Sequence, residues 1–425
     1  MPRFISTRGA APAVSFRQAL FAGLAPDGGL YMPEALAPID FEELRDATLT
    51  EVGAAIAGRF IGHELPRAQL EHLLRDALNF PMPLALVGEH AVVELFHGPT
   101  FAFKDIGARV MARLMAAFNQ DLQDSRVVTI LVATSGDTGG AVADAFHNLA
   151  GTRVVVLFPE GRVTPVQEAQ FTTLGGNITA IAVDGSFDDC QRLTKEVFAD
   201  AELGRRLRLT SANSINIGRL MPQAFPYTYA ALQSPNPVTF SVPSGNFGNL
   251  TAGLIAWKLG VPIHRLIAAT TINDSVPRYL HTGHYQPKPS VSTLANAMDV
   301  GAPSNFERMQ WLCREDAGGL RSILTASVHT DDDVRRTIAE VFERYRYVCD
   351  PHTAIGYAAL LVKATEDGPT AFLATAHPAK FKETVEPAIR AHVPLPTELA
   401  AALKRPRLVE RIPASSDALR DLLTT

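Results

Sequence analysis

Between residues 91 and 376 the chain alternates short apolar, often β-branched runs with segments of helical apolar spacing, and this pattern restricts the fold most strongly. Strands are expected at 92–96, 127–132, 153–158, 178–183, 238–242, 263–269 and 371–376. Helices are expected between them, at 104–118, 136–149, 164–174, 187–203, 218–232 and 249–259. Strands that alternate with helices predict βαβ units, and hence an α/β protein with largely parallel sheet.

The two ends of the chain and one internal segment do not follow this alternation. Residues 1–90 show helical patterns broken by turn clusters and are expected to form a helical unit. Residues 281–310 are rich in Pro, Ser, Asn and Gly, which predicts a long loop with a functional or covering role. The tail, 391–425, is mixed in composition and is expected to be peripheral.

Charge and cysteine usage narrow the functional class. The formal net charge of −5 is too mild to indicate a nucleic-acid partner, and no basic run is interleaved with aromatic residues. The cysteines, Cys190, Cys313 and Cys349, are far apart in sequence, which predicts a reducing compartment and no disulfide framework. We see no membrane-spanning apolar run, no signal-peptide core and no metal motif, so we expect a cytoplasmic protein without a membrane partner.

The most informative single residue is Lys104, which ends the segment HGPTFAFK and is surrounded by apolar positions. A desolvated ammonium has a lowered pKa, and the neutral amine is then a nucleophile suited to a Schiff base with an aldehyde cofactor. The alternative is an interfacial lysine at a helix start, paired with Asp105 or Glu94. Position alone favours this alternative, since most lysines are structural or solvated.

Two loops between a strand and a helix have the character of anion-binding turns. In residues 243–249, PSGNFGN, glycines expose successive N–H groups ahead of a helix N-terminus, which suits a phosphate. In residues 133–140, ATSGDTGG, hydroxyls and N–H groups gather at another helix start. The alternatives are an ordinary turn with Asn249 as N-cap, and a helix cap built on Ser135 or Asp137. Two such loops suggest a ligand with two anionic ends, or two anionic ligands.

Two further stretches carry polar side chains next to predicted helices or strands. Residues 213–219, NSINIGR, place Arg219 at a helix start, where it could bind phosphate or carboxylate. The alternative is a capped helix with a surface ion pair. Thr375 lies at the end of the last predicted strand, the edge at which open parallel sheets bind ligands. The alternative is an ordinary strand-end threonine, because β-branched residues favour strands.

Together, these stretches resemble the threonine synthases of the branch found in enterobacteria and yeast. The matching motifs run in order along nearly the whole chain: STRG (6–9), GLAPDGGLY (23–31), HGPTFAFKD (97–105), TSGDTG (134–139), NSINIGR (213–219), PSGNFGN (243–249), NDSVPR (273–278), ANAMDV (295–300) and ATAHPAK (374–380). A match of this extent is far more specific than any one loop.

The resemblance implies a pyridoxal-phosphate enzyme with the tryptophan-synthase β-like fold, known as fold type II. The implied domains are a helical N-terminal domain (1–90), a large cofactor-binding α/β domain (91–125 and 221–390), a small α/β domain (126–220) and a peripheral segment (391–425). The implied reaction converts O-phospho-L-homoserine and water to L-threonine and phosphate, the last step of threonine biosynthesis. We expect a monomer or homodimer.

Site residues follow from the resemblance motif by motif. Lys104 matches the catalytic, cofactor-linked lysine. The other implied cofactor-binding residues are Gly245, Asn246, Phe247 and Asn249 around the cofactor phosphate and Thr375 facing the pyridine nitrogen. The implied substrate-binding residues are Ser135, Thr138, Asn213, Ser214 and Arg219. Asp137 departs from the wider superfamily, in which asparagine often contacts the cofactor 3′-oxygen, so its role is open.

Three rival functions share some of these features. A related phospho-lyase would eliminate phosphate and release an α-keto acid. A hydroxyamino-acid dehydratase on the same fold would not need the arginine and the second anion loop. A non-catalytic metabolite-binding relative would not need Lys104, Thr375 and the glycine loop together.

Overall fold

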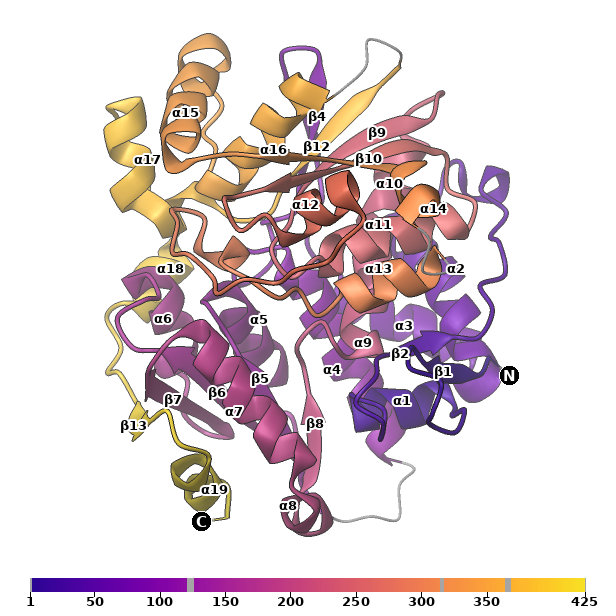
Figure 1. Ribbon diagram of the computed structural model, residues 1–425, viewed down its shortest axis with the longest axis vertical. Coiled ribbons are helices and arrows are strands. Elements are labelled where there is room, and N and C mark those ends of the chain that lie inside the picture. The colour runs from indigo at the N-terminus through magenta and orange to yellow at the C-terminus, as the bar shows by residue number, and fades with distance from the viewer. Residues whose placement is uncertain (1, 121–125, 314–316, 364–367, 425) are drawn as a thin grey trace.

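The structure, a computed structural model, describes residues 2–120, 126–313, 317–363 and 368–424 (Figure 1). The described chain forms two parallel-rich sheets with helices packed around them and a short antiparallel pair near the N-terminus. The predicted α/β class is confirmed. No helix in these ranges is long and apolar enough to cross a membrane. The domain boundary expected at residue 125 lies outside the described residues.

The larger sheet has six strands in the order β11-β10-β9-β12-β4-β3. They are β3 (Leu84–Val87), β4 (His90–Glu94), β9 (Val238–Pro243), β10 (Ile263–Thr270), β11 (Leu324–Val328) and β12 (Thr370–Ala374). All neighbours are parallel except the antiparallel pair β3 and β4. Strand β12 lies between β4 and β9, so the lysine segment after β4 and the glycine loop after β9 flank the end of β12.

The smaller sheet has five strands in the order β13-β7-β6-β5-β8, and all of its neighbours are parallel. The strands are β5 (Val128–Ala133), β6 (Thr152–Pro159), β7 (Ile178–Asp184), β8 (Arg208–Ser211) and β13 (Glu410–Pro413). Every residue of β5 is buried, and its side chains alternate between two clusters, with Ile130 and Val132 in one and Leu131 in the other. Burial on both faces explains the continuous apolar run of this strand.

The helices divide among the sheets and the N-terminal unit. Around the smaller sheet are α5 (Asp137–Phe146), α6 (Pro165–Thr172), α7 (Phe187–Ala199), α8 (Ala201–Arg206) and α19 (Ser416–Thr424). Around the larger sheet are α10 (Phe225–Leu232), α11 (Gly248–Lys258), α12 (Ser275–Thr282), α13 (Phe306–Leu312), α14 (Ala317–Arg321), α15 (Asp331–Tyr345), α16 (Pro351–Lys363) and α17 (Lys382–Ile389). Helix α16 packs directly on β9, β10, β11 and β12.

The N-terminal unit is joined to both sheets through the helix that begins with Lys104. It contains β1 (Phe4–Ser6), β2 (Tyr31–Pro33), α1 (Phe16–Ala22), α2 (Leu49–Ile61) and α3 (Arg67–Ala77). Helix α4 (Lys104–Gln120) packs on α3, on α5 and on the short helix α9 (Ile217–Leu220). The residues that follow α9 form a 3₁₀ turn, Met221–Ala224, that leads into α10. Helix α4 therefore contacts the N-terminal unit, a helix of the smaller sheet and the segment that leads to α10.

Several elements differ from the sequence prediction. Strand β3 falls inside the range expected to be helical, because it is a partly exposed edge strand with a weak apolar signal. The helix expected at 187–203 is divided at Asp200, whose carboxylate caps a second helix by accepting from the N–H groups of Glu202 and Leu203. The expected loop at 281–310 contains a 3₁₀ turn, Asn296–Met298, and the start of α13. The C-terminal segment adds β13 to the edge of the smaller sheet and also forms α18 (Thr397–Ala402).

Candidate active site

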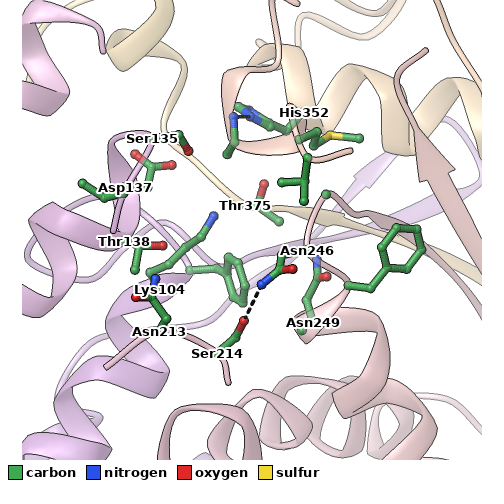
Figure 2. Close-up of a pocket in the computed structure, with 18 of the residues that line it drawn as sticks. Lys104, Ser135, Asp137, Thr138, Asn213, Ser214, Asn246, Asn249, His352 and Thr375 are labelled. Carbon is green, nitrogen blue, oxygen red and sulfur yellow. Dashed lines mark hydrogen bonds between the residues drawn. The ribbon is translucent and has the colours of Figure 1, made fainter. Parts of the chain in front are cut away.

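One pocket gathers the segments that follow five parallel strands, β4, β5, β8, β9 and β12 (Figure 2). This placement is expected, because open parallel sheets bind ligands beyond the carboxyl ends of their strands. Every site residue inferred from the sequence lines this pocket: Lys104, Ser135, Thr138, Asn213, Ser214, Arg219, Gly245, Asn246, Phe247, Asn249 and Thr375. The fold therefore brings together residues from both sheets around the side chain of Lys104.

The backbone around Lys104 is fixed from two sides. The N–H of Phe103 donates to the carbonyl of Thr375 at 2.9 Å, and Ala102 forms a bridge with Ala376. On the other side, the carbonyl of Lys104 accepts from Nη1 of Arg219 at 3.0 Å. These contacts hold the lysine beside Thr375 at the start of α4.

The amine of Lys104 is buried and its pKa is lowered. Burial lowers its pKa, and the charges of Lys380 and Arg219 lower it further against the opposing effects of Asp137 and Asp350. The Nζ of Lys104 lies 4.8 Å from the centroid of the Phe103 ring. No carboxylate in the described part of the chain lies within ion-pair distance of it.

The alternative interpretation of Lys104, an ion pair with Asp105 or Glu94, is wrong. Asp105 accepts instead from Oγ1 of Thr100 at 2.5 Å and from its N–H at 2.9 Å. Glu94 bonds to Nε2 of His97 at 2.7 Å. Both carboxylates are used to shape the loop that leads to Lys104, which leaves the amine unpaired.

Asp105 makes the stability of this loop sensitive to pH. Burial raises its pKa to about 6, although the hydrogen bonds from Thr100 oppose the rise. A carboxyl whose folded pKa exceeds its unfolded value contributes stability that is complete below about pH 4 and is lost as the pH rises through about 6. Asp105→Asn removes this titration while keeping the shape of the side chain.

We therefore expect the parent protein to lose about 2–3 kcal/mol of unfolding free energy relative to Asp105→Asn between about pH 4 and pH 7. Urea unfolding of both proteins at pH values across this range measures the difference. A difference that does not vary with pH would contradict the raised pKa of Asp105.

The glycine loop presents unused N–H groups at the start of α11. Among the described residues, no protein acceptor takes the N–H groups of residues 246–248. A Cβ on Gly245 would lie 2.5 Å from Cα of Met298, so only glycine fits there. Phe247 adopts the left-handed conformation with φ of 58° and occupies the N-cap position. Successive free N–H groups at a helix N-terminus form an anion cradle.

Asn249 is therefore not the N-cap that one interpretation of the sequence expected. It lies inside α11, and its side chain instead braces the loop from within. Its Oδ1 accepts from Oγ of Ser244 at 2.9 Å, and its Nδ2 donates to the carbonyl of Pro243 at 2.8 Å. The side chain holds the turn closed so that the free N–H groups converge.

Ser214 connects the glycine loop to the loop after β8. Its Oγ accepts from Nδ2 of Asn246 at 3.2 Å and from Nδ2 of Asn305 at 2.8 Å (Figure 2). Because a hydroxyl has two acceptor lone pairs and one proton, these two bonds leave the proton of Ser214 available to an anion. The structure thus adds Asn305, which the sequence did not single out, to the support of the site.

The start of α5 presents two hydroxyl side chains to the pocket. Oγ1 of Thr134 accepts from the N–H groups of Gly136 and Gly139, at 2.9 and 2.8 Å. The expected cap on Ser135 or Asp137 is wrong, since Thr134 performs it. The hydroxyls of Ser135 and Thr138 are consequently free to face the pocket. The loop of Asn213 closes against this turn, and its Nδ2 donates to the carbonyl of Ala133 at 2.8 Å.

Arg219 brings an unpaired positive charge to the pocket. Its side chain is only 2% exposed, and Nε donates to the carbonyl of Ala212 at 2.7 Å. No carboxylate among the described residues lies within 4.0 Å of its guanidinium. Burial lowers its pKa to about 10, so it stays charged at neutral pH. The expected surface ion pair is therefore wrong, and a buried cation without a counter-ion favours an anionic ligand.

Two residues at the pocket were missed or left without a role by the sequence analysis. His352 sits at the start of α16, with Nδ1 2.6 Å from Oδ2 of the buried Asp350, and its Nε2 accepts from the N–H of Ala297 at 3.2 Å. The DPHT sequence at 350–353 could have indicated it. Asp137, whose role was open, forms a buried ion pair with Lys380 at 2.7 Å.

Comparison with known proteins identifies the family of the chain. Residues 88–376 match the family of pyridoxal-phosphate dependent enzymes, residues 3–78 match the threonine synthase N terminus, and residues 353–423 match the C-terminal part of threonine synthase. The threonine synthase of Serratia marcescens is 46% identical over 96% of both chains. The chain belongs to the threonine synthase family. It is therefore a pyridoxal-phosphate-dependent lyase of threonine biosynthesis.

Solved structures agree with this assignment. The threonine synthase of Escherichia coli superimposes with a TM-score of 0.95 at 43% identity over 99% of both chains. A pyridoxal-phosphate-bound threonine synthase from Brucella melitensis gives 0.91 at 37% identity, covering 100% of this chain and 99% of that one. A tomato threonine deaminase, at 18% identity and a TM-score of 0.56, shares the fold alone and covers 75% of this chain and 88% of that chain.

The pocket fits the cofactor that the family uses. The free N–H groups after Gly245 suit its phosphate, and the unpaired amine of Lys104 suits its aldehyde. Thr375 is buried at the end of β12, and its side chain points toward the same space as Lys104 (Figure 2). These three features lie in one pocket.

Proposed function

We propose that this protein converts O-phospho-L-homoserine and water to L-threonine and phosphate at the pocket of Lys104. The observation that carries the proposal is the placement of an unpaired buried lysine in one pocket with an unpaired buried arginine and the starts of α11 and α5. One helix start suits the cofactor phosphate. The second start and Arg219 then remain for a substrate with two anionic ends.

When bound, the cofactor supplies an aldehyde that activates the substrate amine and a ring that accepts electrons from the substrate carbon atoms. We assign the following residues to the binding of this cofactor. The free N–H groups of residues 246–248, which include Asn246 and Phe247, would bind its phosphate, in the loop that Gly245 makes possible and Asn249 braces. The hydroxyl of Thr375 would hold its ring nitrogen, and the amine of Lys104 would hold its aldehyde.

We assign the remaining residues to the substrate. The amine of Lys104 would remove the α-proton of the substrate, because it is held in the pocket with a lowered pKa. Ser135 and Thr138, at the positive end of α5, bind the carboxylate. Arg219 and the free proton of Ser214 stabilise the departing phosphate. Asn213 positions the loop of Ser214 through its bonds to Ala133.

Product analysis tests this function against its nearest rival. The purified protein with pyridoxal phosphate is incubated with O-phospho-L-homoserine, and phosphate, amino acids and keto acids are measured. We expect threonine and phosphate in equal amounts. Phosphate with 2-oxobutyrate and ammonia would instead indicate a phospho-lyase, and keto-acid formation from free threonine would indicate a dehydratase.

Arg219→Ala should weaken the reaction of the phosphorylated substrate selectively. Removing one preorganised buried charge at a reacting group costs roughly 10²–10³-fold in rate. We expect that loss for phosphate release from O-phospho-L-homoserine, and a much smaller loss for α-proton exchange of homoserine in D₂O, followed by NMR. Arg219→Lys keeps the charge and should recover part of the difference. Equal losses on both substrates would remove Arg219 from the phosphate site.

We also propose that the protein works in the cytoplasm, as a monomer or homodimer. The buried thiols of Cys190 and Cys349 form no disulfide, which suits a reducing compartment.

A further inference from the structure

A second buried lysine lies next to the pocket. Lys380 lies in the segment after β12, and it is 0% exposed. Its Nζ donates to the carbonyl of Thr100 at 2.8 Å and forms an ion pair with Oδ1 of Asp137 at 2.7 Å. The same oxygen of Asp137 accepts from Nε2 of Gln167 at 2.9 Å. Asp137 itself lines the pocket, whereas Lys380 stands behind it.

The carboxylate of Asp137 therefore forms an ion pair with Lys380 and not with Lys104. Asp137 pairs with Lys380, while Lys104 lies beyond 4.0 Å from it and has no ion pair among the described residues. Burial would raise the pKa of Asp137, but the charges of Lys380 and Lys104 and the bonds from Lys380 and Gln167 bring it down to about 2. Asp137 thus stays ionised, and its position at the first turn of α5 favours this form.

We propose that Lys380 is a positioning residue that engages Asp137 and thereby withholds this carboxylate from Lys104, keeping the amine of Lys104 unpaired and reactive. Without Lys380, the buried carboxylate would have Lys104 as its nearest ammonium. An ion pair there would hold Lys104 protonated, because an opposite charge within a few ångströms stabilises the charged form. The effect on the reactivity of Lys104 rests on the proposed function, whereas the ion pair of Lys380 with Asp137 does not depend on it.

The other charged groups facing Lys104 are already accounted for. Arg219, from α9, bonds to the carbonyls of Ala212 and Lys104. Asp350, before α16, is engaged by His352 and Thr353. Asp137 is the pocket carboxylate whose pairing a single substitution can redirect.

The test measures the amine of Lys104 in the full-length protein without the need for turnover. Reductive methylation with ¹³C-formaldehyde in the cofactor-free protein labels the amine, Lys104→Ala identifies its resonance, and NMR titration gives its pKa. For Lys380→Met we expect the pKa of Lys104 to rise by about 1–2 units. The rate of cofactor incorporation near pH 7, followed by absorbance, should fall about 10-fold or more as the neutral amine is depleted.

Lys380 also donates to the carbonyl of Thr100, so its loss could act by disturbing the loop. Matched variants separate that structural effect from the effect on Asp137. Lys380→Arg keeps a partner for Asp137 and should stay near the parent value. Adding Asp137→Asn to Lys380→Met removes the competing carboxylate and should return the pKa of Lys104 to near the parent value. An unshifted pKa in Lys380→Met, or an equal shift in the double variant, would overturn the proposal.

Asp137→Asn alone keeps the shape of the pair and should lower the pKa of Lys104. An unchanged value in this variant overturns the proposal even where Lys380→Met does not fold. These titrations do not involve the substrate. Failure of the proposed function would appear in the product analysis instead. It would leave the order of the Lys104 pKa values among the variants unchanged.

Discussion

Replacing Lys104 by alanine should lower threonine formation by at least about 10³-fold, because general acid–base catalysis alone contributes about 10²–10⁴-fold. The same change also removes the covalent anchor of the cofactor. The side chain is replaced by a smaller apolar one beside Phe103, and the backbone contacts to Thr375 and Arg219 can persist. The loss is therefore chemical rather than structural.

The measurement compares steady-state threonine formation with unfolding temperature in the same preparation. Lys258→Ala, at an exposed position near the end of α11, is the matched control and should keep full activity. A Lys104→Ala protein that retains even about a tenth of the parent rate would contradict the role of this amine as the proton carrier.

Gly245→Ala should give the second large effect, a loss of cofactor affinity of about 10²-fold or more, since even a 1 Å misplacement in a site can cost about that much. The added Cβ would lie 2.5 Å from Cα of Met298 and 2.6 Å from the carbonyl oxygen of Ala297. Both are backbone atoms, so the loop itself must move, and the free N–H groups of residues 246–248 would no longer converge.

Gly58→Ala is the matched control for this substitution. Gly58 lies in α2, and a Cβ there would meet nothing within 4 Å. It should leave cofactor binding unchanged and stabilise the helix by about 0.5–1 kcal/mol. Equilibrium dialysis of pyridoxal phosphate against each variant gives the affinities. Parent-like affinity in Gly245→Ala would show that the glycine loop does not hold the phosphate.

The core strands could be predicted from sequence because both sheet faces are covered. Strand β5, with every residue buried, carries the apolar run ILVA, and β6 carries the longer run VVVLF. Strand β3 has only its last residue buried, and β8 has two of its four positions partly exposed, so neither leaves a strong pattern. The assignment of strands to two separate sheets had no local signal.

The site residues that could be predicted from the sequence are those that lie at the ends of strands. Lys104, the glycine loop and Thr375 follow neighbouring strands of one sheet, so parallel topology alone brings them together. Partners that depend on packing could not be predicted. Lys380 and Asp137 are far apart in sequence, and only the meeting of the two sheets pairs their side chains.

The free proton of Ser214 is a second feature that only the packing reveals. It depends on two amides, from Asn246 and from Asn305, reaching the same oxygen from different segments. The segment of Asn305 was expected to be loop, and it lies instead at the start of α13. Sequence identified the donors and acceptors, while the structure determined which of them are left for a ligand.

The most direct test of the account is to locate the cofactor on the intact protein. The holoenzyme is reduced with borohydride and digested, and the modified peptide is identified by mass spectrometry. We predict a single modified residue, Lys104, although Lys380 lies next to the same pocket. Modification of Lys380 or of any other lysine, or no modification of a protein that forms threonine, would contradict the assignment of Lys104 as the residue around which the site is built.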